Sequence, residues 1–137
     1  MIKNIAVGEK IVGPSHNMDH HTLMEFENVI WRRGLNVHSD PEAAKESGMD
    51  RMIASGQNQL AVLHEMLETQ FGEGWTKGGQ IAVRWIRPVY VDDTINSFAE
   101  VTEFAEAEGK KQVLLNVWCE NQDGQKTGVG TARAYLR

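Results

Sequence analysis

The residues best suited to chemistry lie in two short segments in the middle of the chain. His38 stands in an irregular stretch between two expected helices, and Ser55-Gly56-Gln57 opens a third. A neutral imidazole accepts a proton readily at neutral pH, as general acid–base catalysis requires. The first turn of a helix presents backbone N–H groups and the positive end of the helix dipole, which stabilise an oxyanion. The two segments could therefore supply a proton acceptor and an oxyanion site.

Each of these residues also has a purely structural interpretation. His38 could be a hydrogen-bonding residue of the loop, and Ser55 or Gly56 could simply cap the helix, a role compatible with oxyanion binding. The absence of a side chain at Gly56 would let a ligand approach the backbone closely. Asp40 could orient His38 or a water molecule, but its place directly before Pro41 favours the N-cap of a short helix.

The other titratable residues are weaker candidates. His64 and Glu65 are adjacent in the expected central helix and should point to different faces, so we expect a polar face toward solvent or a partner chain. Cys119 lies in an apolar, strand-like run, which favours a buried and inert thiol. No metal site is expected, because the N-terminal histidines, His16, His20 and His21, are expected to be exposed imidazoles without a closed set of acidic or Cys ligands.

The helices that must position these residues follow from the apolar pattern. A short strand is expected over Ile5 to Val12, and a helix within Asp19 to Arg33. Pro41 to Gly48 should form a short helix capped by Asp40. The most apolar helix is expected over Gln57 to Phe71, and such broad apolarity requires that a sheet or a partner chain wraps it.

The remainder of the chain is strand-like. Strands are expected over Gln80 to Arg87, with Ile81, Val83 and Trp85 on one face, and then over three further segments, Ile95 to Phe104, Gln112 to Glu120 and Lys126 to Leu136. Glu108-Gly109 and Asp123-Gly124 indicate hairpin turns. Such a sheet has one apolar face, which only the central helix can cover. The sequence therefore predicts one α+β domain over residues 1–137.

The composition restricts the function classes. The chain has 137 residues, of which 41% are hydrophobic and 24% charged, as in an ordinary globular domain. With a single Cys no intrachain disulfide is possible, and neither a signal peptide nor a membrane-spanning run is present. We therefore expect a cytoplasmic protein. The net charge of −5 and the lack of a basic block argue against nucleic-acid binding.

Two stretches of sequence are similar to a known family. Asn36-Val37-His38-Ser39-Asp40-Pro41-Glu42-Ala43-Ala44, followed by Gly48 and Ile53-Ala54-Ser55-Gly56, resembles the signature region of the MaoC-like dehydratases, which include the (R)-specific enoyl-CoA hydratases. Arg87-Pro88-Val89-Tyr90-Val91-Asp92-Asp93-Thr94 is similar to a turn of that family, with Asp92 where Gly is usual. The resemblance implies a hotdog fold, in which an antiparallel sheet wraps around a long central helix. It also implies a dimer with a continuous sheet and a thioester-binding tunnel near the dimer interface.

The resemblance further implies a reaction. In the hydratases an Asp and a His five residues apart activate a water molecule for addition to an enoyl thioester, and a backbone N–H at the start of the central helix stabilises the enolate oxygen. His38 and Gly56 match the His and the N–H donor, with Asp40 a weaker catalytic candidate. The Asp position falls on Arg33 without a gap, or on Gly34 with a one-residue gap.

The same resemblance implies an acyl-CoA or acyl-carrier-protein thioester as ligand and no cofactor. Candidate contacts to that ligand are Asn36, Ser55, Gln57, Arg84 and Arg87. A hydro-lyase acting on a 2-enoyl or 3-hydroxyacyl thioester is the leading hypothesis. Two alternatives remain: a non-catalytic hotdog subunit that binds an acyl thioester or pairs with an active partner, and a hotdog thioesterase with Glu65 as base. We expect a homodimer at least.

Overall fold

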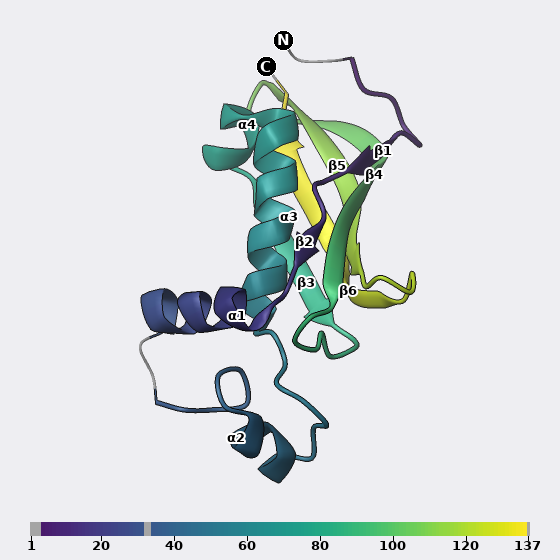
Figure 1. Cartoon of the computed structure of the whole chain (residues 1–137). Helices are drawn as coiled ribbons and strands as arrows, with labels where there is room; N and C mark the ends of the chain where they lie inside the picture. Colours follow the sequence, from purple (N-terminus) through teal and green to yellow (C-terminus); the bar gives the residue numbers. More distant parts are fainter. Residues whose placement is uncertain (1–3, 32–33, 137) are drawn as a thin grey trace.

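The most apolar helix of the sequence, α3 (Gly56–Phe71), lies along one face of an antiparallel sheet (Figure 1). The computed structural model describes residues 4–31 and 34–136. The side of α3 that faces the sheet is buried, and its apolar members are Val62, Leu63, Met66, Leu67 and Phe71. The predicted α+β architecture, an antiparallel sheet wrapped around a long central helix, is confirmed.

The sheet contains the four expected strands and one short strand at its edge. β3 (Gln80–Trp85), β4 (Thr94–Ala107), β5 (Lys110–Glu120) and β6 (Lys126–Tyr135) join β1 (Lys10–Val12) in the order β1-β4-β5-β6-β3. The two-residue β2 (His16–Asn17) pairs with β4. Glu108 and Gly109 both have positive φ, 53° and 74°, and form the expected tight turn between β4 and β5.

The core lies between α3 and the inner face of the sheet. Alternate residues of β4 and β5 point toward the helix, and among them Val101, Val113, Leu115 and Val117 are at most 1% exposed. Cys119 continues this row with no exposed surface, as the apolar run around it predicted. Burial raises the pKa of the Cys119 thiol to about 12, so the thiol is uncharged and unreactive at neutral pH.

The N-terminal region differs from the prediction in two places. The strand expected from Ile5 begins only at Lys10, because a turn at Gly8, with φ 87°, precedes it. The first helix, α1 (His20–Phe26), is capped by the Asp19 side chain and passes into a π-helix, η1 (Glu27–Trp31), instead of continuing as an α-helix. The expected end of that helix at Arg33 lies outside the described residues.

The segments around the start of α3 complete the fold. α2 (Pro41–Glu46) is capped by Asp40 as predicted, and α1 and α2 lie near the end of α3 where that helix begins (Figure 1).

A short helix not predicted, α4 (Glu73–Thr76), follows α3. β3 ends at Trp85, two residues before the expected end at Arg87, and Trp85 is 40% exposed. No helix in the described part of the chain has the length and apolarity needed to cross a membrane.

Candidate functional site

A cavity of ≈ 390 Å³ lies at the start of α3. His38 and Gly56 both line it, so the structure brings together the proton acceptor and the helix start that the sequence singled out. Exposed Arg87 also lines the cavity. The remaining walls are mostly apolar and comprise Ile53, Ala54, Trp85, Ile86, Pro88 and Val89, with Gln59 as a further polar member. A largely apolar cavity with a few convergent polar groups is typical of a small-molecule site.

The His38 ring is held in one orientation by the backbone. Its Nδ1 lies 2.8 Å from the carbonyl oxygen of Ile53. A carbonyl oxygen only accepts hydrogen bonds, so Nδ1 carries the hydrogen and donates it. In the neutral ring Nε2 is then the unprotonated nitrogen, which can take a proton from a bound water molecule. The half-buried His38 therefore has the tautomer that a general base requires.

Asn36 holds the loop around His38 together. Its side-chain oxygen accepts from the backbone N–H of His38 at 2.8 Å, and its Nδ2 donates to the Gly34 carbonyl at 2.9 Å. Nδ2 also lies 3.3 Å from Oε2 of Glu27. These bonds occupy the amide, so we reassign Asn36 from substrate contact to positioning of His38.

Glu27 is a buried carboxylate that the sequence analysis missed. It belongs to η1, is only 3% exposed, and reaches the His38 loop through Asn36. A Glu within an amphipathic helix is normally a surface residue, so no sequence signal distinguished it. Arg33, at the family's Asp position, lies outside the described residues. The buried carboxylate near the His38 loop is therefore that of Glu27, which lies earlier in the chain than the family's Asp position.

The start of α3 is capped from within. The backbone N–H and the hydroxyl of Ser55 both donate to Oδ1 of Asn58 at 3.1 Å, and Ser55 is 5% exposed. Ser55 therefore caps the helix and does not line the cavity, and its expected contact with a ligand stays a prediction. A side chain at Gly56 would overlap the indole Nε1 of Trp85. The missing Cβ thus makes room for the indole, which lies across the helix start.

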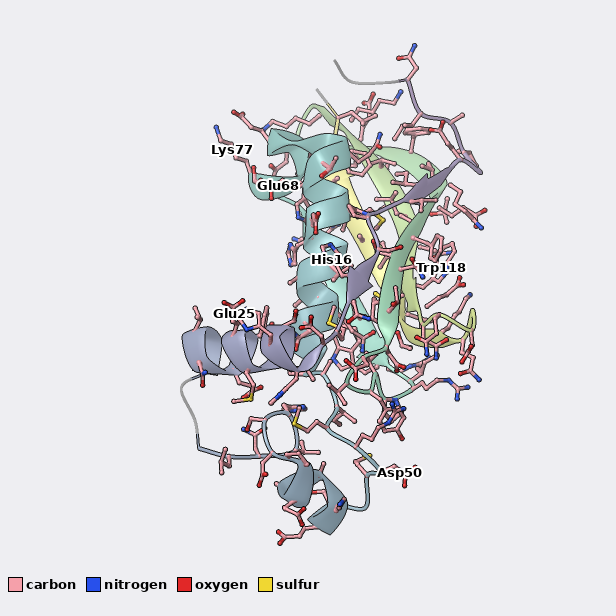
Figure 2. All side chains as sticks on the ribbon, viewed as in Figure 1. His16, Glu25, Asp50, Glu68, Lys77 and Trp118 are labelled. Carbon is pink, nitrogen blue, oxygen red and sulfur yellow. The ribbon has the colours of Figure 1, made fainter. Side chains whose placement is uncertain are left out.

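Three other candidates are not brought to this cavity. The Asp40 carboxylate accepts from the backbone N–H groups of Glu42 and Ala43, so Asp40 caps α2 and is no partner of His38. Exposed Gln57 faces a different hollow on α3. Exposed Arg84 lines a hollow on the outer face of the sheet that also contains Trp118, and Figure 2 shows Trp118 on the side of the sheet away from α3.

Glu65, the candidate base of a thioesterase, also lies apart from the cavity. Its Oε2 is 2.7 Å from Nε2 of His16, which lies beside α3 (Figure 2). The two side chains are 45% and 39% exposed. His64 lines the same hollow of ≈ 610 Å³ on the outer side of α3, but the two adjacent side chains have different partners, since the His64 ring accepts from Nε1 of Trp75 at 3.1 Å.

The comparisons with known proteins place the chain in a family. The family described as MaoC like domain matches residues 35–123, more than half of the chain. The chain belongs to this family. Comparison with curated protein sequences gave no match.

Several solved structures share the fold of this chain. The MaoC-like dehydratase from Rhodospirillum rubrum is 20% identical, with a TM-score of 0.80, covering 96% of this chain and 92% of that one. The R-hydratase PhaJ1 from Pseudomonas aeruginosa is 23% identical, with a TM-score of 0.79 and coverage of 96% and 82%. A chain of the ChsH1-ChsH2 complex from Mycobacterium tuberculosis is 19% identical, with a TM-score of 0.77 and coverage of 96% and 98%. The fold is the hotdog fold.

One departure of this MaoC-like chain from its family has a structural explanation. Asp92 stands where the family usually has Gly, in the turn after β3, and its φ is 73°. Such left-handed backbone favours Gly, but Asp is among the residues that tolerate it best. The turn is held by the next residue, since Oδ2 of Asp93 accepts from the backbone N–H of Tyr90 at 2.8 Å.

Proposed function

We propose that this MaoC-like protein is a hydro-lyase that adds water to a 2-enoyl thioester, or removes it from a 3-hydroxyacyl thioester. The observation that supports this most is the shared cavity of His38 and Gly56. The imidazole there has the tautomer of a base, and the helix start offers N–H donors to an oxyanion.

The reaction proceeds by two proton transfers. His38 Nε2 takes a proton from water while the water oxygen bonds to C3 of the enoyl thioester. The electrons of the double bond move onto the thioester oxygen, and the N–H at Gly56 stabilises the resulting enolate. The protonated His38 then returns a proton to C2, which gives the 3-hydroxyacyl thioester. The step is redox-neutral and its atoms balance.

The cavity walls suit an acyl thioester. The apolar residues Ile86 and Val89 would contact the acyl chain, and exposed Arg87 would meet a phosphate of coenzyme A or of the carrier-protein arm. Arg84, on the outer face of the sheet, is not assigned to this ligand. The ligand is thus an acyl-CoA or acyl-carrier-protein thioester.

The test is to incubate short- and medium-chain 2-enoyl-CoA with the purified chain and follow the loss of enoyl absorbance. Hydration of either chain length supports the proposal. Binding of acyl-CoA without any hydration contradicts it, and release of free thiol would instead support a thioesterase.

A second candidate is a non-catalytic subunit that pairs with an active partner chain. Arg33 and Gly34 occupy the two possible positions of the family's Asp, which supports this alternative. The ChsH1-ChsH2 complex, a chain of which shares the fold, contains two different named components. This alternative predicts that the chain alone does not hydrate a 2-enoyl thioester, and that hydration appears when an active second subunit is added.

We propose that the chain also self-associates. β3 is an edge strand, and the adjoining Trp85 and Ile86 are 40% and 50% exposed beside the cavity. Burial of such apolar side chains against a second copy would be favourable. Sedimentation should therefore show a dimer or larger species, and a clean monomer of 15.4 kDa at micromolar concentration would contradict this.

A further inference from the structure

We propose that the side-chain amide of Gln59, held by Thr127, donates a second hydrogen bond to the thioester carbonyl oxygen. This inference rests on the proposed function, because it assumes that an acyl thioester occupies the cavity at His38. Gln59 touches the substrate in this account, so it would be a catalytic residue and not a positioning residue.

Gln59 lies where such a donor is needed. It is one helical turn beyond Gly56, and residues three apart share a helix face. Both residues line the cavity that contains His38. Gln59 is only 3% exposed, so little of its side chain meets bulk solvent. The amide therefore stands beside the helix start that we assign to the enolate.

The contact with Thr127 sets which end of the amide faces the cavity. The hydroxyl of Thr127 donates to Oε1 of Gln59 at 2.7 Å, and Thr127 has no exposed surface. A fully buried hydroxyl hydrogen needs an acceptor, which the amide oxygen supplies. With the oxygen engaged, the NH₂ group is the free end. Within residues 4–31 and 34–136 it has no protein acceptor.

A local irregularity in the sheet directs Thr127 toward α3. Cys119 pairs with Gly128 and Glu120 pairs with Lys126, so Thr127 is an extra residue between two paired positions. Such bulges re-aim side chains and are frequent beside active sites. The Thr127 carbonyl also accepts from the backbone N–H of Ile86, another residue that lines the cavity. Thr127 thus connects Gln59 to Ile86.

The free amide group of Gln59 is open to the cavity. In the described part of the chain its Nε2 is not one of the buried atoms that lack a hydrogen-bond partner, so this donor stays available to a ligand in the cavity. Two donors directed at one oxygen, the Gly56 N–H and Gln59 Nε2, are what a developing enolate requires. Gln59 forms no covalent bond and moves no proton in this step.

The test uses a saturated acyl-CoA whose carbonyl carries heavy carbon, so that its stretching band can be resolved in the infrared. The saturated chain cannot be hydrated, and the band reports hydrogen bonding independently of turnover. We expect a lower frequency on the wild type than on Gln59→Leu. Thr127→Val should give an intermediate value, because the amide is then free to turn. Gln70→Leu, a Gln on the same helix outside the cavity, should match the wild type.

Turnover gives the second readout. Gln59→Leu should lower kcat for 2-enoyl-CoA hydration by about 10²–10³, the usual loss of one oxyanion donor, with a smaller change in KM. If Gln59→Leu does not fold, Gln59→Met and Thr127→Val provide the same comparison.

The outcomes separate the two proposals. If the carbonyl band shift depends on Gln59 but the wild type hydrates no 2-enoyl-CoA, the amide contact is supported and the hydro-lyase proposal is overturned. An unchanged band and unchanged kcat in Gln59→Leu overturn the amide contact and leave the hydro-lyase intact. Failure of the saturated acyl-CoA to bind the wild type overturns the amide contact as well.

Discussion

Helix α3 has polar residues on two sides, and the two sides differ in how these residues are held. At its start, Gln59 is 3% exposed, and the facing His38 ring bonds to the Ile53 carbonyl. On its outer side, Glu65 and its partner His16 are 45% and 39% exposed. Both sides combine an imidazole with a polar partner. On the first side Gln59 is buried and His38 half-buried, whereas both partners on the second side are exposed.

The difference indicates which side does chemistry. Exposed ion pairs contribute little energy, because water screens them and their side chains remain free to move. Buried polar groups with fixed partners are pre-organised, and they act more strongly where water is excluded. A His–Glu pair on the exposed side is thus a weaker catalytic candidate than an imidazole held by a single backbone carbonyl. The following predictions test this contrast.

The largest effect is expected for His38→Ala. Loss of the general base should lower kcat for 2-enoyl-CoA hydration by about 10²–10⁴, with little change in acyl-CoA affinity. Stability should barely change, because the half-buried ring lies in a loop. Steady-state kinetics and a thermal melt check both statements. Equal kcat values for the variant and the wild type would exclude His38 as the base.

Asn36→Ala should have the next largest effect. The substitution removes the acceptor for the His38 backbone N–H and leaves the loop less fixed. Misplacement of a catalytic group by about 1 Å can lower the rate 10²-fold, so we expect a loss in kcat of about 10-fold to 100-fold. Asn116→Ala, at an exposed position on β5, is the control. The positioning role fails if the two variants are equally active.

Glu65→Gln should change hydration by less than about threefold, since exposed pairs of this kind contribute little. The same variant tests the thioesterase alternative, in which the carboxylate would be the base. Thiol release from an acyl-CoA, measured with a chromogenic thiol reagent, should be equally low in the variant and the wild type. If the wild type releases thiol and the Glu65→Gln variant does not, the exposed side of α3 carries the chemistry and the contrast drawn above is contradicted.

Cys119→Ala should also leave turnover within a few-fold, because the thiol is buried in β5 and does not line the cavity. Its effect on pH-dependent stability is distinct. The folded pKa of about 12 exceeds the ordinary value of 9.0, so between these values the unfolded chain loses a proton that the folded chain keeps. Wild-type stability should therefore fall by up to about 1.4 kcal/mol per pH unit more steeply than that of the variant. Denaturant melts from pH 8 to 11 measure the difference, and parallel curves would contradict it.

The sequence predicted the fold better than the site. Periodicity located α3 and the four long strands to within a few residues, because each has one apolar face that must be buried. His38 and Gly56 were identified from residue type, helix position and a family motif. These are local signals, and they do not report what packs around a residue.

The missed residues depend on contacts between distant segments. Gln59 is one polar residue in an apolar helix, and its role emerges only from Thr127, which lies far along the chain in a bulge. Glu27 is buried at the start of a π-helix, which apolar spacing did not predict. Gln57 and Arg84 were chosen for their proximity in sequence to motif residues, but helix and strand geometry turns both away from the cavity.

The most direct test of the hydro-lyase proposal follows the oxygen atom of water. The chain is incubated with a 2-enoyl-CoA in water labelled with heavy oxygen, and the products are examined by mass spectrometry. The account predicts one heavy oxygen on C3 of an intact 3-hydroxyacyl-CoA, with this product strongly reduced in His38→Ala. Heavy oxygen in a free carboxylate, with no labelled 3-hydroxyacyl-CoA, would show thioester hydrolysis and contradict the central claim.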